Sequence, residues 1–416
     1  MKRNVIRKTI FRYLRCFALF LLVFSLGMIC VYLIPNSALD PRFSKSQAQI
    51  EKEKPYAVYL FDTDAAIMDN FMDGLMVNSC YVSDTYTSKI KAAFDNNGYP
   101  RYWNGYLLTL RPFLTQFTYQ QTRYISMFIL LLAFCFSFSG IHKQLNAPAA
   151  FAFAISIIAC FLVFLGESLQ YFSVFMILFS VMLIILYAPF FQKPINSALL
   201  LFAAGMTTNF FDMLTAPLLT LGMPLTLLLC IWIQNENKPT LFERIKQIII
   251  HSITWGAGYA LCWISKWALG TLILGINVFE DAMKTAKFRV EGSEAIPLNR
   301  AQMFRLNIDT YYFAKGHKPA AILFLILIIL IAVLVRKHKK DWMATIISFL
   351  LIAVLPYIWF FVFANHSQLH YFYTYRIQAV TLFSLLCALC SSIDWGSFSY
   401  FNKNNEIFSN NGKISV

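Results

Sequence analysis

Carboxylates that could do chemistry are concentrated in one short stretch near the N-terminus. The sequence FDTDAAIMDNFMDG holds four aspartates and no basic residue, in a chain whose formal net charge is +14. A carboxylate acts as a general base when it lies within hydrogen-bond reach of the proton it removes. The stretch therefore predicts a catalytic or cation-holding site, or else a surface helix whose polar side is acidic. The four residues are Asp62, Asp64, Asp69 and Asp73.

The spacing within residues 67–76 predicts the element that would position two of these carboxylates. At about 100° per residue, the apolar residues share one broad side of a helix, while Asp69 and Asp73 share the other. We expect a short amphipathic helix at the membrane boundary, with the aspartates facing a cavity or water. One of residues 62–64 would cap its N-terminus.

A second segment of interest, YPRYWNGYLLTLRPFL, spans residues 99–114. It combines Trp103 and Tyr106 with Arg101 and Arg111. Arginine suits bidentate recognition of a phosphate, whereas Trp and Tyr are also typical of the interface belt of ordinary membrane proteins. The segment therefore predicts either an interfacial binding surface or an aromatic belt alone.

Two further carboxylates follow apolar runs. Glu167 lies in GESLQYF, and Asp212 lies in TTNFFDMLTAP, which has the composition of an interrupted helix. Carboxylates at membrane depth are costly and usually have a partner or a function. We interpret both as candidate substrate contacts, with ordinary headgroup-level residues as the alternative.

The stretch NHSQLHYFYTYR adds a polar and aromatic cluster near the C-terminal end of the chain. His366 and His370 are four residues apart, a spacing that can present both to one metal ion, although two histidines alone are weak evidence. Together with Tyr375 they would equally line a sugar site. Arg376 would suit a phosphate or pyrophosphate, or would simply snorkel to the interface.

Composition shows what must carry these groups. The chain is 58% hydrophobic and 13% charged, and several apolar runs are long enough to cross a bilayer. We predict an all-α polytopic membrane protein, one membrane domain over residues 1–416, with about ten transmembrane helices. The positive charge is expected at membrane flanks, and nucleic acid is not expected as a partner. The predicted centres are Leu22, Leu131, Ile157, Phe179, Ala204, Leu225, Tyr259, Leu327, Ala353 and Leu385.

Lysine and arginine recur in alternate short loops, which orients the chain by the positive-inside rule. Both termini are predicted to be cytoplasmic in a multi-pass protein of the cell membrane, with a cytoplasmic tail over residues 395–416. Two long external loops would span residues 35–123 and 276–318, the first with short interfacial helices. All the unusual polar groups then fall on the external face.

This arrangement resembles the GT-C superfamily of integral membrane glycosyltransferases and, in DNFMDGLM, RYWNGY and NHSQLHYFYTYR, uncharacterised bacterial multispan proteins. The shared features are a cytoplasmic N-terminus, a long first external loop with interfacial helices, an acidic residue soon after the first span, and many spans. The resemblance implies an inverting transferase whose donor is a sugar on a polyprenyl phosphate or pyrophosphate. The acceptor would be a cell-surface glycan, lipid or protein.

Carried onto this chain, the resemblance implies Asp69 as the first candidate for the base, ahead of the other three aspartates. It implies donor-phosphate contacts at Arg111, Arg376 and Arg101. The chain has no paired Asp-Glu motif, which leaves open whether a divalent metal takes part. The alternatives are a transporter or flippase for a polar lipid or solute, and a non-catalytic partner in a membrane assembly.

Overall fold

Most of the chain folds into helices, as expected for a protein this apolar. In lipid every backbone polar group must be paired within the protein, and a helix achieves this within one segment. The computed structural model describes residues 2–58, 63–83, 86, 88–235, 237–313 and 340–393. The bundle consists of α1 (Lys2–Tyr32), α6 (Tyr119–Gln144), α7 (Ala147–Ile158), α8 (Leu162–Leu165), α9 (Leu169–Tyr187), α10 (Pro194–Phe211), α11 (Leu219–Gln234), α12 (Leu241–Leu274), α16 (Trp342–Ala353), α17 (Leu355–Val362) and α20 (Ala379–Ser392), with a 3-10 turn η3 (Pro189–Gln192).

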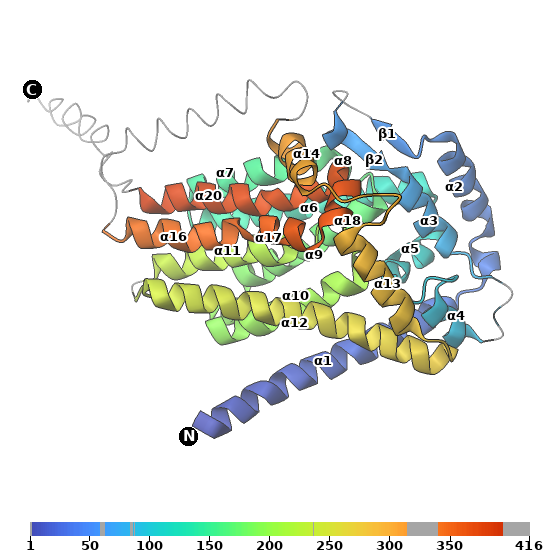
Figure 1. Ribbon diagram of the computed structural model, residues 1–416, viewed down its shortest axis with the longest axis horizontal. Helices are drawn as coiled ribbons and strands as arrows, with labels where there is room; N and C mark the ends of the chain where they lie inside the picture. Colours follow the sequence, from blue (N-terminus) through green and yellow to red (C-terminus); the bar gives the residue numbers. More distant parts are fainter. Residues whose placement is uncertain are drawn as a thin grey trace, which may run out of the picture.

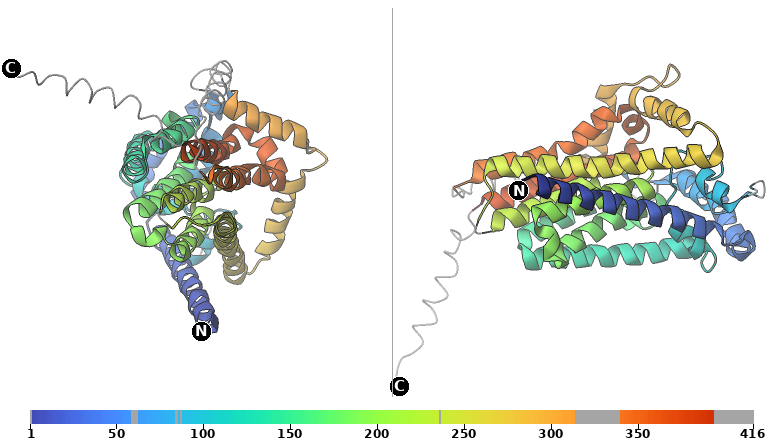
Figure 2. Two further views of the ribbon diagram at one scale, coloured as in Figure 1. Left: turned by 90° about the vertical axis from the view of Figure 1, so that its left-hand side faces the viewer. Right: turned by 90° about the horizontal axis from the view of Figure 1, so that it is seen from below.

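The long helices lie side by side, and the first part of α1 leans away from the others (Figures 1 and 2). Within the described residues, six helical segments are long and apolar enough to cross a membrane, and α7 and α11 are shorter apolar helices. The prediction of an all-α, membrane-embedded chain is confirmed, but the number of about ten spans is not. Every predicted centre that falls in the described residues lies in a helix, and Leu327 lies outside them.

Both long connections gather at one end of the bundle, which we call the loop end (Figure 1). The expected short helices are present in the first connection, and the second carries two helices between residues 276 and 313. The predicted tail, 395–416, and residues 314–318 lie outside the described residues. The loop-end elements are η1 (Asn36–Ala38), α2 (Asp40–Lys52), β1 (Tyr56–Val58), η2 (Asp64–Ala66), β2 (Ile67–Asp69), α3 (Asn70–Ser79), α4 (Lys89–Asp95), α5 (Leu107–Leu114), α13 (Val278–Glu291), α14 (Arg300–Tyr312), α18 (Ala364–Leu369), α19 (Tyr371–Thr374) and η4 (Tyr375–Gln378).

The prediction of one helix over residues 67–76 is wrong at its start. Residues 67–69 form strand β2, which pairs antiparallel with β1 so that Tyr56 lies opposite Asp69. The helix begins at Asn70, and Asp69 is its N-cap rather than a residue of its polar face. A short apolar pattern cannot separate strand from helix, and the partner strand that decides the matter comes from earlier in the chain.

Close packing of α10 against α12 is a central contact of the bundle, and two glycines allow it. A Cβ added at Gly205 of α10 would collide with the carbonyl oxygen of Trp255, and one at Gly258 of α12 would collide with that of Phe202. Small residues let two backbones approach in this way, and such contacts are a main source of helix association in membranes.

We predict that Gly258→Ala lowers the unfolding free energy by about 1–3 kcal/mol, because the new methyl group must push α12 away from α10. Thermal unfolding of the purified protein in detergent measures this effect. The matched control is Gly256→Ala in the same helix, since nothing lies within 4 Å of a Cβ added there. Equal melting temperatures for the two variants would contradict the packing argument.

Candidate functional site

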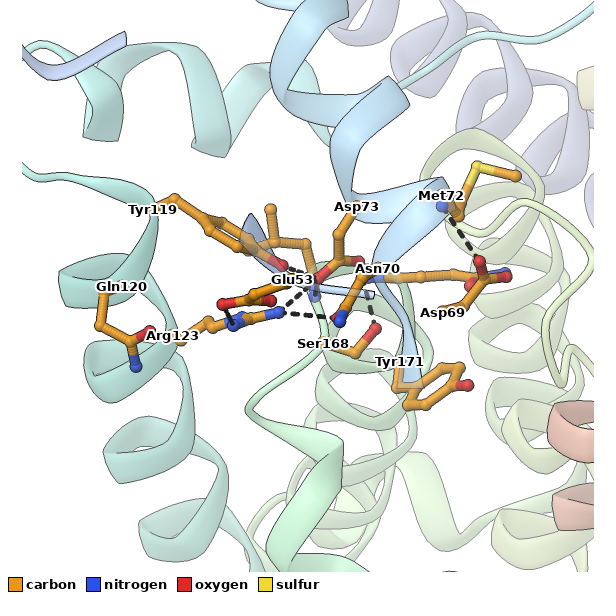
Figure 3. Close-up of polar contacts among 12 residues, drawn as sticks. Glu53, Asp69, Asn70, Met72, Asp73, Tyr119, Gln120, Arg123, Ser168 and Tyr171 are labelled. Atoms are coloured by element: carbon orange, nitrogen blue, oxygen red, sulfur yellow. Dashed lines mark hydrogen bonds and ion pairs between the residues drawn. The ribbon is translucent and has the colours of Figure 1, made fainter. Parts of the chain in front are cut away.

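Asp73 joins α3, α6 and α9 through one buried carboxylate (Figure 3). Its oxygens accept hydrogen bonds from the hydroxyl of Tyr119 at 2.8 Å and from that of Ser168 at 3.1 Å. They also accept from the backbone N–H groups of Leu169 at 3.0 Å and Gln170 at 3.2 Å, in the first turn of α9. All four partners donate, which suits an ionised carboxylate, and the N-terminus of a helix favours negative charge.

Arg123 of α6 supplies positive charge beside this carboxylate. Its Nη2 lies 4.0 Å from an oxygen of Asp73 and donates to the Asn70 side chain at 2.9 Å. Its Nη1 pairs with Glu53 at 2.9 Å, and its guanidinium lies 4.0 Å from the ring centroid of Tyr119. Burial raises the pKa of Asp73, while Arg123 and the donated hydrogen bonds oppose this shift.

These contacts give Asp73 a structural role, and we leave it out of the candidate site. The prediction that Asp69 and Asp73 share an open polar face is wrong, because Asp73 is fully buried between α6 and α9. The reason is that its partners come from residues 119–123 and 168–170, distant segments that a helical wheel of residues 67–76 cannot include.

Asp69 occupies a different environment at the start of α3. It is 3% exposed, and its Oδ1 accepts a hydrogen bond from the backbone N–H of Met72 at 3.0 Å (Figure 3). No described residue donates a hydrogen bond to its Oδ2. Burial raises the pKa of this carboxyl to about 6, against the opposing effect of the Met72 N–H. A pKa near the working pH is favourable for a general base.

Aromatic residues connect Asp69 to the second connection of the loop end. The hydroxyl groups of Tyr171 in α9 and Tyr373 in α19 interact electrostatically with the Asp69 carboxylate. The Tyr373 hydroxyl also interacts with the charge of Arg289 in α13, and its ring stacks on that of His370 at 5.0 Å. The Tyr373 hydroxyl is thus within electrostatic range of both Asp69 and Arg289.

A cavity of about 430 Å³ opens between α13 and α18. Arg101 along its wall pairs with Asp281 at 2.9 Å, and Lys284 pairs with Glu280 at 2.7 Å. Arg289 makes no ion pair with any described residue, so its charge faces the cavity uncompensated. The polar side chains along the cavity are those of Arg101, Lys284, Thr285, Arg289, Asn365, His366 and His370.

His366 holds Arg289 from the α18 side. Its Nδ1 lies 2.6 Å from Nη1 of Arg289, and its Nε2 lies 2.9 Å from the carbonyl oxygen of Leu214. A guanidinium only donates and a carbonyl only accepts, so we assign the proton to Nε2. Burial and the neighbouring Arg289 hold the pKa of His366 well below its ordinary value, which keeps the ring neutral.

The Leu214 carbonyl is itself fixed by a tight turn between α10 and α11, where an interrupted helix was expected. Both carboxylate oxygens of Asp212 accept from the N–H of Thr215, at 3.2 and 3.0 Å. Leu214 is 1% exposed and has φ of 65°, a conformation that side chains other than glycine rarely adopt. Burial raises the pKa of Asp212 to about 7.

Two residues that were predicted to bind phosphate, Arg111 and Arg376, instead donate hydrogen bonds to backbone carbonyls of the protein. Arg111 is fully buried and donates to the carbonyl oxygens of Cys80 and, at 2.6 Å, Ile34. Arg376 is fully buried and donates to the carbonyls of Cys160 at 3.2 Å and Ala65 at 3.4 Å. These contacts explain both cations as anchors of the loop end, and we leave them out of the candidate site.

Three predicted aromatic contacts are also parts of the core. Trp103 and Tyr106 are buried in the hydrophobic cluster between the first connection and α1, and the indole N–H of Trp103 donates to the carbonyl of Cys262 at 2.9 Å. The buried Tyr375 hydroxyl donates to the carbonyl of Ala65 at 3.0 Å. None of the three lines the cavity at α13.

Two of the remaining predicted carboxylates, Glu167 and Asp64, have surroundings different from those of Asp69. Glu167, before α9, is half-buried, and burial raises its pKa against the opposing charge of Arg123. Asp64 is exposed and accepts a hydrogen bond from the Tyr371 hydroxyl at 3.0 Å. Asp62 lies outside the described residues.

A metal site at the histidine pair is not favoured. Both ring nitrogens of His366 are already engaged, by Arg289 and by the Leu214 carbonyl. Among the described residues there is no group of three or more His, Cys, Asp or Glu side chains placed to hold an ion.

Sequence reasoning missed Arg289 and Lys284, which contribute to the cavity. Both lie in the predicted second external loop, in the mixed-charge segment FEDAMKTAKFRVE. The signal that could have found Arg289 is the pairing pattern along α13. Lys284 has an acidic residue four positions earlier, at Glu280, whereas Arg289 has no acidic residue three or four positions away in either direction.

Comparisons with known proteins found no match that bears on this site. No protein-family model matches the chain, and no curated protein or solved structure matches it either.

We predict that Asp73→Asn lowers the unfolding free energy by about 3–5 kcal/mol, because it removes the buried negative charge beside Arg123 and places an NH2 donor where an oxygen accepted hydrogen bonds. Asp69→Asn should change stability by less than about 1 kcal/mol, because asparagine caps a helix as well as aspartate does. Thermal or denaturant unfolding of the two variants in detergent makes the comparison. Equal destabilisation would show that the division of roles between the two aspartates is incorrect.

Proposed function

We propose that the protein is a membrane glycosyltransferase that moves a sugar from a polyprenyl-phosphate or pyrophosphate carrier to an acceptor hydroxyl. One observation carries the proposal: Asp69 is a buried carboxylate with a pKa of about 6 and an oxygen that no described residue binds. It lies at the same end of the bundle as a cavity whose cation Arg289 is uncompensated. A base and an anion site are what such a reaction needs.

In the proposed step, Asp69 accepts the proton of the acceptor hydroxyl. The acceptor oxygen then attacks the anomeric carbon from the side opposite the carrier, and the bond from that carbon to the phosphate oxygen breaks. The phosphate leaves with the electron pair, and the configuration inverts. Cationic groups stabilise the charge that develops on this leaving group. Arg289 and Arg101, along the cavity, are the groups placed for that role.

The proposal also assigns a direction in the membrane. The positive-inside rule favours a loop end on the external side, with both termini in the cytoplasm. The donor would then be a lipid-linked sugar of the outer leaflet, and the acceptor a glycan, lipid or protein at the cell surface.

A transporter or flippase is the alternative function, and it would favour ionisable residues within the membrane-spanning helices. Lys266 is a buried lysine within α12, but its ammonium donates to the carbonyl of Phe94 at 2.6 Å and lies 5.5 Å from the ring centroid of Trp103. It therefore holds α4 against the bundle. We find no observation among the described residues that favours transport over transfer.

We predict that Asp69→Asn lowers the transfer rate by about 100-fold or more, because an amide cannot accept the acceptor proton. The assay is transfer of radiolabelled sugar from a panel of polyprenyl-phosphate sugars by the full-length protein in liposomes. The wild-type rate should rise with pH through about 6, as Asp69 loses its proton, and should then level off.

The matched control is Asp64→Asn, an exposed carboxylate of the same segment, which should keep the wild-type rate. A wild-type rate in Asp69→Asn would remove Asp69 as the base. Solute or lipid movement across vesicles in the absence of any acceptor would favour the transporter instead.

A further inference from the structure

Arg289 differs from the other cations of the cavity because it has no ion-pair partner among the described residues. Arg101 and Lys284 each have a carboxylate partner, Asp281 and Glu280 respectively, whereas Arg289 has none among the described residues. Its Nε is buried and has no hydrogen-bond partner. Arg289 as a whole is half-buried at the cavity, and a cation without a carboxylate partner there favours an anion that would bind its remaining N–H groups.

A long arginine side chain needs other groups to hold it in one orientation, because fixing it costs conformational entropy. In this protein the restraint comes from a neutral histidine. His366 accepts from Nη1 of Arg289 with one nitrogen and donates to the Leu214 carbonyl with the other. Its neighbour Asn365 donates to the carbonyl oxygen of Phe288 at 2.8 Å. Two successive residues of α18 therefore contact two successive residues of α13, Phe288 and Arg289.

The other end of this chain of contacts is rigid. Leu214 is buried in a left-handed conformation, and the turn that contains it is closed by the Asp212 carboxylate on the N–H of Thr215. Strained backbone of this kind persists only where the surroundings determine it fully, and it is often found at functional sites. The Leu214 carbonyl therefore offers His366 a fixed point.

We propose that His366 is a positioning residue that holds Arg289 toward the cavity, where the guanidinium binds the phosphate of a lipid-linked donor. The inference rests on the proposed function for the identity of that phosphate. A donor group held in place before its ligand arrives contributes more to binding than one that must be ordered first. Arg289 touches the ligand in this account, and His366 acts only through Arg289.

Two conservative variants separate this role from simple structural support. In His366→Asn the amide oxygen can stand near the position of Nδ1 and still accept from Arg289. In His366→Gln the longer side chain can reach the position of Nε2 and still donate to the Leu214 carbonyl, while the acceptor for Arg289 is lost. The measurement is the affinity for farnesyl phosphate, by titration calorimetry, of the full-length protein in phosphatidylcholine nanodiscs.

Arg289→Ala should weaken farnesyl phosphate binding about tenfold or more, the scale of one lost hydrogen bond to a charged group. His366→Gln should also weaken binding, and His366→Asn should retain most of the affinity. In an Arg289→Ala background, His366→Gln should have no further effect. The control is Lys287→Ala, an exposed cation of the same helix that does not line the cavity, which should bind like wild type.

The opposite pattern, with His366→Gln retaining affinity and His366→Asn losing it, would overturn the positioning role in favour of support for the Leu214 turn. Wild-type affinity in Arg289→Ala would overturn the anion site. Tighter binding of inorganic phosphate than of farnesyl phosphate would overturn its assignment to a lipid-linked ligand. Sugar transfer that persists in Arg289→Ala with unchanged affinity overturns this inference alone, whereas Arg289-dependent binding without any transfer overturns the proposed function alone.

Discussion

Burial of the Asp73 carboxylate at the N-terminus of α9 removes the water that would hydrate it. Only a full set of hydrogen-bond donors from the protein offsets this cost of desolvation. Two hydroxyl groups, two backbone N–H groups and the nearby Arg123 supply it. The two helices that carry these donors, α6 and α9, are thereby fixed relative to α3. Because α3 cannot shift without breaking this set, its N-cap Asp69 is held in one place at the loop end (Figure 3).

The same physical rule separates structural cations from candidate functional ones. Arg111 and Arg376 are buried, and they donate hydrogen bonds to backbone carbonyls that would otherwise be costly to bury. In the candidate site, one oxygen of Asp69 accepts no hydrogen bond from a described residue, and Arg289 has no carboxylate partner among the described residues. Groups whose bonding is incomplete in the protein are the natural places for a ligand, and the Tyr373 hydroxyl interacts electrostatically with both of these.

The sequence predicts the helices well, because their apolar length is a local property. It also predicts the acidic stretch as noteworthy and the break near Asp212, since both are visible in local composition. It cannot predict strand β2, which depends on a partner at residues 56–58. Nor can it distinguish Asp69 from Asp73, because Tyr119, Arg123 and the start of α9 determine the burial of Asp73 from far along the chain. The local charge pattern of α13 could have marked Arg289 as unpaired, but its contact with His366, 77 residues away, could not be predicted from that pattern.

The central claim is that the loop end binds a lipid-linked phosphate beside Asp69. A cryo-electron microscopy structure of the protein in nanodiscs with added polyprenyl phosphate tests it directly. The account predicts density for the phosphate in the cavity between α13 and α18, in contact with Arg289, and with the lipid leading away into the bilayer. Phosphate density at another place, with the cavity empty at a saturating concentration of the lipid, would contradict it.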